Sequence, residues 1–210
     1  MRVLGIDPGV TNGGFAVIEI AGPRLFHLLG VTDIPTFGDE HRKRVDVLKL
    51  AAWLRPFEIE QAVIERAQLM PKRDKDGKNV LQGLSSGGKY MRAVGAIEAT
   101  AILSGAKLST VESASWKHHY GLRGGAENKD ASRLLAIKFF PEWEGTLARK
   151  KDHNRAEAIL IARFAALHFA SSGETSKPPL ADAGQLGLWR EGEGEPDEKR
   201  TGRRRHALSR

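Results

Sequence analysis

The sequence predicts an α/β fold: a mixed sheet in which three antiparallel strands are followed by parallel strands, flanked by helices. Three observations lead to this prediction. The chain opens with three apolar, strand-like segments separated by turn residues. Two further short apolar strands alternate with segments of helical periodicity. The last long segment, 154–170, is apolar on nearly every side, so it must lie on the sheet as a covered helix.

Local signals set the limits of the elements. The first strand ends at Asp7 because Pro8-Gly9 is a turn signal, and Asn12-Gly13-Gly14 is a second one. A later helix must stop before Pro141, which cannot continue it. In chain order we expect strands at 2–7, 15–20 and 25–31, a helix at 42–54, a strand at 61–65, a helix at 88–104, a strand at 107–112, and helices at 130–140 and 154–170.

The composition divides the chain into two parts. A length of 210 residues with 40% hydrophobic side chains suits one folded domain, which we place at 1–170. From residue 171 the sequence turns to Ser, Gly, Pro and charged runs, so we expect 171–210 to be a disordered charged tail. The tail holds eight Lys or Arg and seven Asp or Glu, which leaves +6 of the net charge of +7 on the first 170 residues.

The charge and the residue usage narrow the classes of function. A net charge of +7 favours a polyanionic partner, nucleic acid before a membrane surface. The absence of cysteine excludes disulfide scaffolds, thiolate zinc sites and thiol catalysis. No apolar run reaches the roughly 20 residues of a membrane span, and an acid comes too early for a secretory signal. We therefore expect a soluble, intracellular protein without a membrane partner.

Three acids stand at the ends of predicted elements. Asp7 ends the first strand, Glu65 ends the strand at 61–65, and Glu157 opens the last helix. Each has an ordinary explanation when taken alone. Asp7 suits a turn, Glu65 could pair with Arg66, and an acid is favourable at a helix start.

Together the three acids suggest a metal site. If the first strand and the strand at 61–65 are neighbours, Asp7 and Glu65 emerge close together, and the last helix can bring Glu157 to the same place. Converging carboxylates repel one another unless divalent cations such as Mg²⁺ or Mn²⁺ lie between them. Paired cations about 4 Å apart clamp the attacking and leaving oxygens of a phosphoryl displacement, and the basic surface points to nucleic acid as the substrate.

The segment Gly5–Gly14, with the sequence GIDPGVTNGG, resembles the opening motif of the RuvC family of Holliday-junction resolvases, the crossover junction endodeoxyribonucleases. The opening motif alone is also similar to that of sugar-kinase and actin-like ATPases. The RAEA sequence at 155–158 is closer to phage and organellar members of the family than to bacterial ones. The resemblance covers about residues 1–170 in the right order, continuing at 63–66, 88–95, 116–117, 120–122 and 151–162.

The resemblance implies a ribonuclease-H-like fold, a homodimer and two Mg²⁺ per active site, with Mn²⁺ as a substitute. It further implies Mg²⁺-dependent resolution of four-way DNA junctions by paired symmetric nicks, through two-metal phosphodiester hydrolysis. By position, Asp7, Glu65 and Glu157 match three of the four metal-binding acids of the family. The implied location is the cytoplasm of a bacterial cell or a phage-infected host.

The fourth metal ligand has two candidates. His153 lies four residues before Glu157, so in a helix it shares that face at an angle of about 40°. Asp152 lies five residues before and would point elsewhere in a helix, but could turn inward as an N-cap. Some family members place a His at this position. We favour His153 in the active site, with Asp152 as a ligand or as its orienting partner, and Asn154 as an outside alternative.

Several basic and apolar residues are candidates for DNA contacts. Lys117 matches a family position near the DNA backbone, and Lys129 does so more weakly. The segment 69–78 suits a loop that inserts at the branch point and contacts phosphates, although a solvated loop explains it equally well. The helix around 86–96 lacks the spacing of a nucleotide P-loop, and its small residues suit close packing, including against a second subunit. The candidate DNA contacts are Leu69, Met70, Lys72, Arg73, Lys89, Arg92, Lys117 and Lys129.

The tail contains one apolar cluster, formed by Gln185, Leu186, Leu188 and Trp189. It resembles the peptide with which bacterial replication and repair proteins dock on the sliding clamp. A short apolar segment in a polar tail is what such docking requires, but a match this short also arises by chance.

Other functions compete with junction resolution. A nuclease of the same fold could act on flaps or replication forks, and a junction-binding protein could have lost its chemistry. The retained acids argue against a non-catalytic protein. The absence of a second phosphate motif and the short chain argue against an actin-like ATPase.

Overall fold

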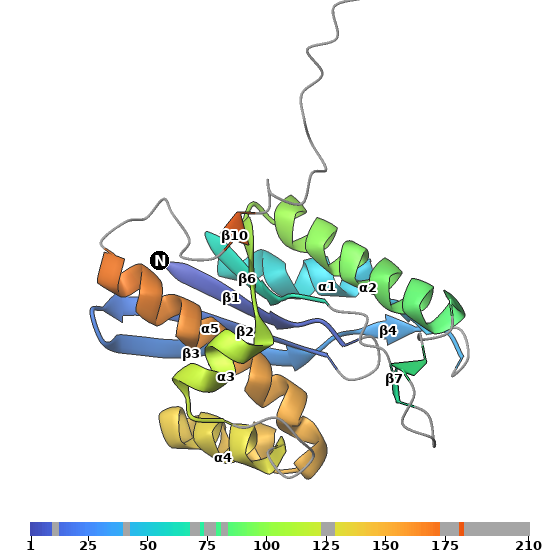
Figure 1. The fold of residues 1–210 in the computed structure, drawn as a ribbon. Coiled ribbons are helices and arrows are strands. Elements are labelled where there is room, and N and C mark those ends of the chain that lie inside the picture. The colour runs from blue at the N-terminus through green and yellow to red at the C-terminus, as the bar shows by residue number, and fades with distance from the viewer. Residues whose placement is uncertain are drawn as a thin grey trace, which may run out of the picture.

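The computed structural model describes residues 1–9, 13–39, 43–67, 72–73, 79–80, 84–122, 129–172 and 181–182. A six-stranded mixed sheet forms its centre, in the order β10-β9-β6-β1-β2-β3 (Figure 1). The first three strands are antiparallel, whereas β1, β6 and β9 run parallel, which confirms the predicted fold class. The strands are β1 (Arg2–Asp7), β2 (Gly14–Gly22), β3 (Leu25–Asp33), β6 (Gln61–Glu65), β9 (Lys107–Val111) and β10 (Ala181–Asp182).

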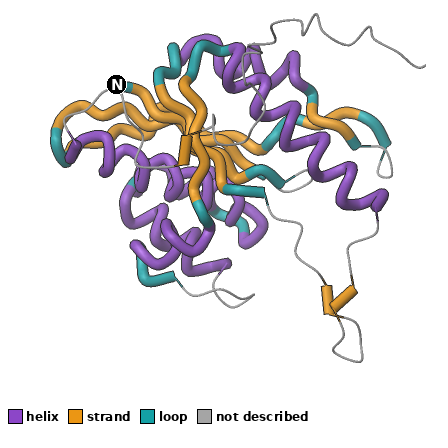
Figure 2. The backbone as a smooth tube through the Cα atoms, turned by 45° about the horizontal axis from the view of Figure 1, so that its top comes forward, coloured by secondary structure: helices purple, strands orange, loops and turns teal. Residues whose placement is uncertain are grey.

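Helices cover both faces of the sheet (Figure 2). The residues that face α1 (Val47–Leu54) and α2 (Leu84–Leu103) form one buried apolar cluster. On the other face, α5 (His153–Ser172) packs on the sheet and forms the second cluster together with α3 (Ser113–His119) and α4 (Lys129–Phe139). Three 3₁₀ helices complete the described helical structure: η1 (Arg55–Phe57), η3 (Pro141–Leu147) and η4 (Lys150–Asp152).

The helix α5 approaches β1 and β2 unusually closely, and glycine makes this possible. A Cβ atom at Gly5 would collide with the backbone of Ala158 and would lie 2.7 Å from the Cβ of Ala162. A Cβ at Gly14 would lie 2.7 Å from the backbone oxygen of Asn154. The small side chains of α5 and these two glycines therefore let the helix lie directly against the strands.

The predicted helix at 42–54 was too long at its start. The helix begins at Val47, and the side chain of Asp46 caps it by accepting a hydrogen bond from the backbone N–H of Lys49 at 3.1 Å. The preceding residues instead form β5 (Arg44–Val45), which pairs with β4 (Thr36–Phe37). An N-cap therefore replaces the helical turn that the apolar spacing had suggested.

Other elements differ from the predicted ones mainly at their ends. The helix predicted at 88–104 begins at Leu84, and the last helix runs from His153 to Ser172 instead of 154–170. The short elements α3, η3 and η4 were not predicted. Nor was the pair β7 (Lys72–Arg73) and β8 (Asn79–Val80), which lies apart from the main sheet in Figure 2.

Two segments of the predicted tail at 171–210, residues 171–172 and 181–182, are described by the structure. Ser171 and Ser172 still belong to α5, and β10 pairs with β9 at the edge of the sheet. The rest of the tail lies outside the described residues. No helix in the described part of the chain has the length and apolar content to cross a membrane.

The contact at Gly5 gives a test of the packing. Gly5→Ala should destabilise the protein by about 1–3 kcal/mol, because the added methyl group meets backbone atoms of α5 that cannot move aside alone. Gly95→Ala is the matched control, since a Cβ at Gly95 in α2 meets no atom within 4 Å. It should stabilise by about 0.5–1 kcal/mol through the better helix propensity of alanine. Urea denaturation measures both changes, and equal stability of the two variants would contradict the described contact.

Candidate active site

The carboxylates of Asp7 and Glu65 end neighbouring parallel strands. Gly5 pairs with Val63 and Ile6 with Ile64, so Asp7 and Glu65 follow at the same edge of the sheet. Gly5 and Asp7 lie two residues apart in β1, and Val63 and Glu65 do so in β6. Because side chains alternate along a strand, both acids belong to the face covered by α5. The sequence prediction that these two acids emerge together agrees with this arrangement.

Glu157 reaches the same place from α5. Its neighbour Ala158 is the residue whose backbone lies against Gly5, two residues before Asp7. Burial raises the pKa of Asp7 well above its ordinary value of 3.8, and the negative charges of Glu157 and Glu65 raise it further. The charges of Glu65 and Glu157 therefore both reach Asp7.

Two residues of α3 contact the other two carboxylates. The indole N–H of Trp116 donates a hydrogen bond to Oε2 of Glu65 at 2.8 Å. The ammonium of Lys117 lies 3.9 Å from Oε2 of Glu157 and 4.9 Å from the centre of the Trp116 ring. The charge of Lys117 also acts to lower the pKa of Asp7, against the larger effects of burial and the two acids.

The alternative explanation for Glu65, a salt bridge with Arg66, does not describe this structure. The guanidinium of Arg66 pairs with Oε1 of Glu112 at 2.8 Å. Sequence reasoning missed Tyr90, which lies in α2. Its pKa is raised by burial and by the charges of Asp7 and Glu65, so its ring belongs to the surroundings of the two acids.

Asp152 and His153 have different roles in the structure. Asp152 is buried and accepts hydrogen bonds from the backbone N–H of Arg149 at 2.9 Å and from its guanidinium at 2.7 Å. These bonds lower the pKa of Asp152. This carboxylate therefore closes the 3₁₀ turn η4 before α5, and its described partner is Arg149 and not the group around Asp7.

His153 is the first residue of α5, so the helix already includes it. Its Nδ1 lies 3.1 Å from the backbone oxygen of Lys150. A carbonyl oxygen can only accept, so this contact favours the neutral tautomer with the proton on Nδ1 and the lone pair on Nε2. Helical spacing puts His153 on the same side of α5 as Glu157. This arrangement favours His153 over Asp152 as the further active-site group.

The candidate DNA contacts are spread over several elements. Lys117 lies beside the carboxylates, whereas Lys89 and Arg92 lie exposed on α2 and line a cavity of 220 Å³ together with Lys43 and Arg44. Lys129 begins α4. The backbones of Lys72 and Arg73 form β7. Leu69, Met70 and the clamp-docking candidates Gln185, Leu186, Leu188 and Trp189 lie outside the described residues.

The residues fit a divalent metal by their chemistry. Three carboxylates and one imidazole offer the oxygen and nitrogen donors that Mg²⁺ and Mn²⁺ accept. Lys117 supplies one positive charge beside these three acids, so with all three ionised the four groups together carry a net charge of −2. A cation would relieve this repulsion. In the described part of the chain, however, no three His, Asp or Glu groups meet closely enough to hold one ion.

The raised pKa of Asp7 predicts a pH-dependent effect on stability. A folded-state pKa above the unfolded value means that stability is present at low pH and is lost as the pH rises through the folded-state pKa. Without metal, Asp7→Asn should therefore gain stability over wild type as the pH rises above 3.8, because it removes the buried charge. Urea denaturation in EDTA across pH measures this gain, with Glu142→Gln in the exposed part of η3 as the control. A gain that does not grow with pH would contradict the assigned surroundings of Asp7.

No family model matches the chain. A segment of 50 residues is 50% identical to the chloroplastic Holliday junction resolvase MOC1 of Chlamydomonas reinhardtii. That segment is 24% of this chain and 6% of the chloroplast protein, so the chain spans only a small part of this relative.

Two solved structures of RuvC from Thermus thermophilus are similar over most of the chain. The structure of RuvC in complex with a Holliday junction substrate has a TM-score of 0.53 at 22% identity, over 85% of this chain and 99% of that one. A second RuvC structure has a TM-score of 0.51 with the same identity and coverage. The three antiparallel strands, the two parallel strands beside them and the covering helices are common to this architecture. The chain has the ribonuclease-H-like fold of the RuvC resolvases.

Proposed function

We propose that the protein is a Mg²⁺-dependent endonuclease that resolves four-way DNA junctions. The observation that carries this proposal is that Asp7 and Glu65 end neighbouring parallel strands of a RuvC-like sheet and that the charge of Glu157 also reaches Asp7. The match to a segment of the chloroplastic resolvase MOC1 and the net charge of +7 support a nucleic-acid substrate. Cleavage of a synthetic four-way junction, compared with a flap, a fork and a linear duplex, tests the proposal and separates it from action on other branched DNA.

In this proposal Asp7, Glu65 and Glu157 would hold two Mg²⁺, for which Mn²⁺ would substitute. When bound, the ions polarise the phosphate and stabilise charge on the attacking and leaving oxygens. His153 accepts the proton of the attacking water at Nε2, because its Nδ1 proton is held by the Lys150 carbonyl oxygen. The bond between phosphorus and the 3′ oxygen breaks, and this oxygen takes a proton from solvent, so hydrolysis leaves a 5′-phosphate and a 3′-hydroxyl.

The residues of α3 position the carboxylates in this mechanism. Trp116 is fully buried, so its hydrogen bond fixes one oxygen of Glu65 and leaves the other for the metal. The ammonium of Lys117 lies close to Glu157, and its charge acts on Asp7. In this position it also attracts the phosphate backbone of the DNA. Asp152 supports the mechanism indirectly, since it fixes the turn from which His153 begins.

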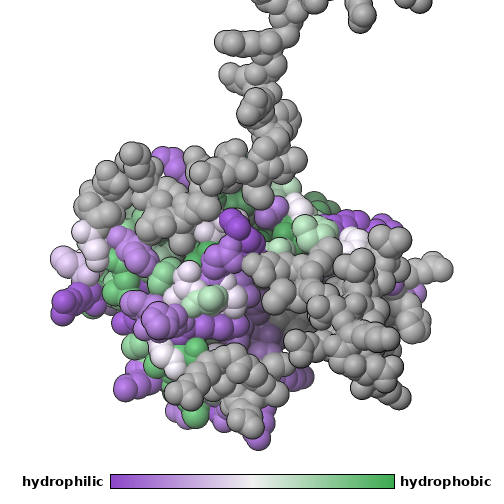
Figure 3. Space-filling model, viewed as in Figure 1, coloured by the Kyte–Doolittle hydropathy of each residue, from purple (hydrophilic) through white to green (hydrophobic). Residues whose placement is uncertain are grey.

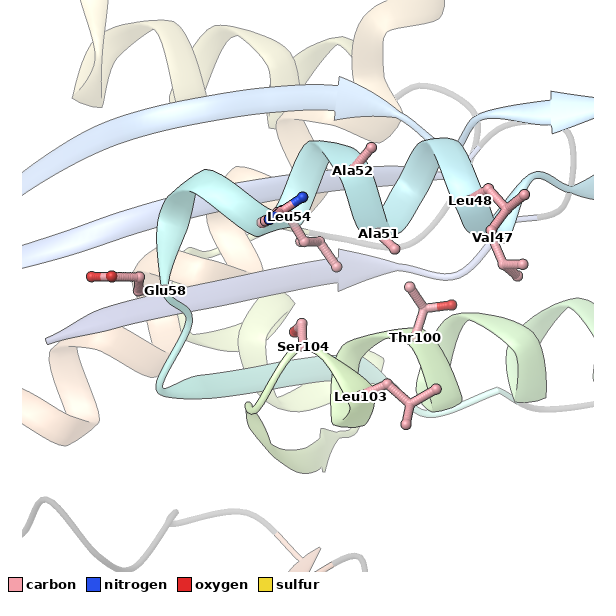
Figure 4. A pocket seen from close by; sticks show the side chains of 10 residues that line it. Val47, Leu48, Ala51, Ala52, Leu54, Glu58, Thr100, Leu103 and Ser104 are labelled. Atoms are coloured by element: carbon pink, nitrogen blue, oxygen red, sulfur yellow. The ribbon is translucent and has the colours of Figure 1, made fainter.

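Paired nicks require two active sites, so we infer a homodimer. Exposed apolar side chains on α1 and α2 support such an interface: Leu48 is 79% and Leu103 87% exposed. They line a groove of 670 Å³ between the two helices (Figure 4). Green, hydrophobic residues are also visible at the top of the space-filling view, where α2 lies (Figure 3). Exposed apolar surface of this kind is typical of an interaction site.

Two further parts of the proposal rest on the sequence alone. Docking on a sliding clamp would use Gln185, Leu186, Leu188 and Trp189, all of which lie outside the described residues. A cytoplasmic location in a bacterial cell or a phage-infected host follows from the resemblance to phage and organellar members. The relative MOC1 is described as chloroplastic.

The metal-binding role of the acids predicts the effect of three substitutions. Asp7→Asn, Glu65→Gln and Glu157→Gln should each abolish Mg²⁺-dependent junction cleavage, because each removes a charged ligand. Junction binding in EDTA should stay equal or improve, because each change also reduces the repulsion of phosphate. A nicking assay and a binding titration measure the two effects, with Glu144→Gln in the exposed part of η3 as the control. Near wild-type cleavage by any of the three variants would remove that acid from the site.

Because Asp152 and His153 have different partners, we expect their substitution to reduce different properties, stability for Asp152 and cleavage for His153. His153→Ala should lose much more cleavage than Asp152→Ala, whereas Asp152→Ala should lose more stability, because it frees Arg149 and opens η4. Cleavage rates and urea denaturation of wild type and both variants measure these effects. If His153→Ala cleaves at the wild-type rate, His153 is not the proton acceptor.

A further inference from the structure

We propose that a polar pocket at the start of α5 binds a phosphate of the DNA backbone that flanks the scissile phosphate. This inference rests on the proposed nuclease function and adds a second phosphate contact, on the side of the carboxylates opposite to Lys117. None of the pocket's three basic residues is among the DNA contacts suggested by the sequence.

The pocket has a volume of 520 Å³ and is strongly polar. Its basic residues are Arg149, Lys151 and Arg155, and its acids are Asp33 and Asp152. One positive charge is therefore in excess. Its other lining residues are Gly13, Ile34, Thr36 and Asn154. A polar pocket with excess positive charge suits an anion better than an apolar or cationic ligand.

The two arginines of the pocket are held in place by the two acids. Arg155 donates to both carboxylate oxygens of Asp33, at 2.7 and 2.6 Å, and to the backbone oxygen of Thr146 at 3.1 Å. Arg149 pairs with Asp152 in the same way, at 2.7 Å. These pairs orient the guanidinium groups without a ligand, and their remaining N–H groups can donate to a phosphate oxygen.

Lys151 supplies the uncompensated charge. Its side chain is exposed at the pocket, and the described part of the chain gives it no ion-pair partner within 4.0 Å. A lysine in this situation is free to contact a phosphate without first breaking a salt bridge. The pocket therefore combines two oriented guanidinium groups with one free ammonium.

The register of the sheet places this pocket beside the carboxylates. Asp33 in β3 pairs with Gly14 in β2, and Gly14 pairs with Asp7 in β1. The backbones of Asp33 and Asp7 are thus two strand spacings apart, about 10 Å. Gly13 connects the two places directly: it lines the pocket, and a Cβ there would lie 2.6 Å from the backbone oxygen of Asp7.

The pocket and Lys117 lie on opposite sides of the three acids. Lys117 belongs to α3, which follows β9, whereas the pocket is bounded by the end of β3 and the start of α5. The sheet order β9-β6-β1-β2-β3 puts β1, with Asp7, between these two sides. A DNA strand whose scissile phosphate lies at the acids therefore continues toward the pocket on one side and toward Lys117 on the other.

The test measures junction binding by the full-length protein in EDTA, with a set of four-way junctions. Each junction carries one neutral methylphosphonate at a different position around the mapped cleavage site. The variants are Lys151→Gln, the charge-preserving Lys151→Arg, and Lys107→Gln as the control. Lys107 is also an exposed lysine, but it lies at the opposite end of β9 from the residue that pairs with Glu65.

We expect Lys151→Gln to weaken binding and to reduce the slope of log K against log salt by about one unit. Lys151→Arg should restore the slope, and Lys107→Gln should leave it unchanged. One methylphosphonate position, next to the cleavage site, should weaken binding by wild type but not further weaken binding by Lys151→Gln. This loss of additivity identifies the phosphate that the pocket contacts.

Three results would overturn the inference. The first is a salt slope of Lys151→Gln equal to that of wild type. The second is an equal loss at every methylphosphonate position, because Lys151 would then add only to the general charge. The third concerns the chemical shifts of the backbone amides of residues 149–155. If titration with inorganic phosphate changes them to saturation and titration with DNA leaves them unchanged, the pocket is a site for free anions. Cleavage by wild type in Mg²⁺ reports separately on the proposed function, so failure of the pocket leaves that result intact.

Discussion

The contact between α5 and β1 at Gly5 is the constraint on which the arrangement of the site depends. The backbone of Ala158 occupies the space where a side chain of Gly5 would be. Because Asp7 follows two residues later on the same face of β1, and Glu157 precedes Ala158, this contact sets the distance between the two acids. The packing of main chain on main chain therefore fixes where the backbones of the two acids lie. Gly14 against Asn154 repeats the same close packing one strand further on.

The close packing has an electrostatic cost, and α3 offsets part of it. Burial and two neighbouring acids raise the pKa of Asp7, so the ionised form of this site is unfavourable without a counter-charge. Trp116 and Lys117 are adjacent in one short helix, and they contact Glu65 and Glu157 respectively. This hydrogen bond and this ammonium add one positive charge to three carboxylates. The remaining negative charge is what a divalent cation would neutralise, which connects the packing of the fold with the chemistry proposed for it.

The sheet and the three acids could be predicted from the sequence because the signals are local. Apolar strands bounded by turns show where β1 and β6 end, and adjacent parallel strands bring Asp7 and Glu65 to one edge. The choice between Asp152 and His153 could not be made in this way. It depends on where α5 begins, and the hydrogen bonds between Asp152 and Arg149 in the 3₁₀ turn η4 set that point. This short polar turn has no periodic pattern of apolar residues from which its end could be predicted. Tyr90 was missed for a related reason: an aromatic residue in a small-residue helix has no motif, and only the fold brings it near the acids.

The interior and the first turn of α5 have different effects on the stability of the fold and on the site. The interior of the helix is alanine-rich and buried, and it stabilises the fold through apolar packing on β1 and β2. The first turn is polar, and ion pairs hold it: Arg155 to Asp33 on β3, and Arg149 to Asp152 just before the helix. Both pairs are partly exposed, so they contribute less to stability than to the position of the turn. The helix therefore anchors Glu157 and His153 through its buried interior and orients them through its first turn. Substitutions in the first turn can consequently change the site without unfolding the domain, whereas substitutions at Gly5 change both.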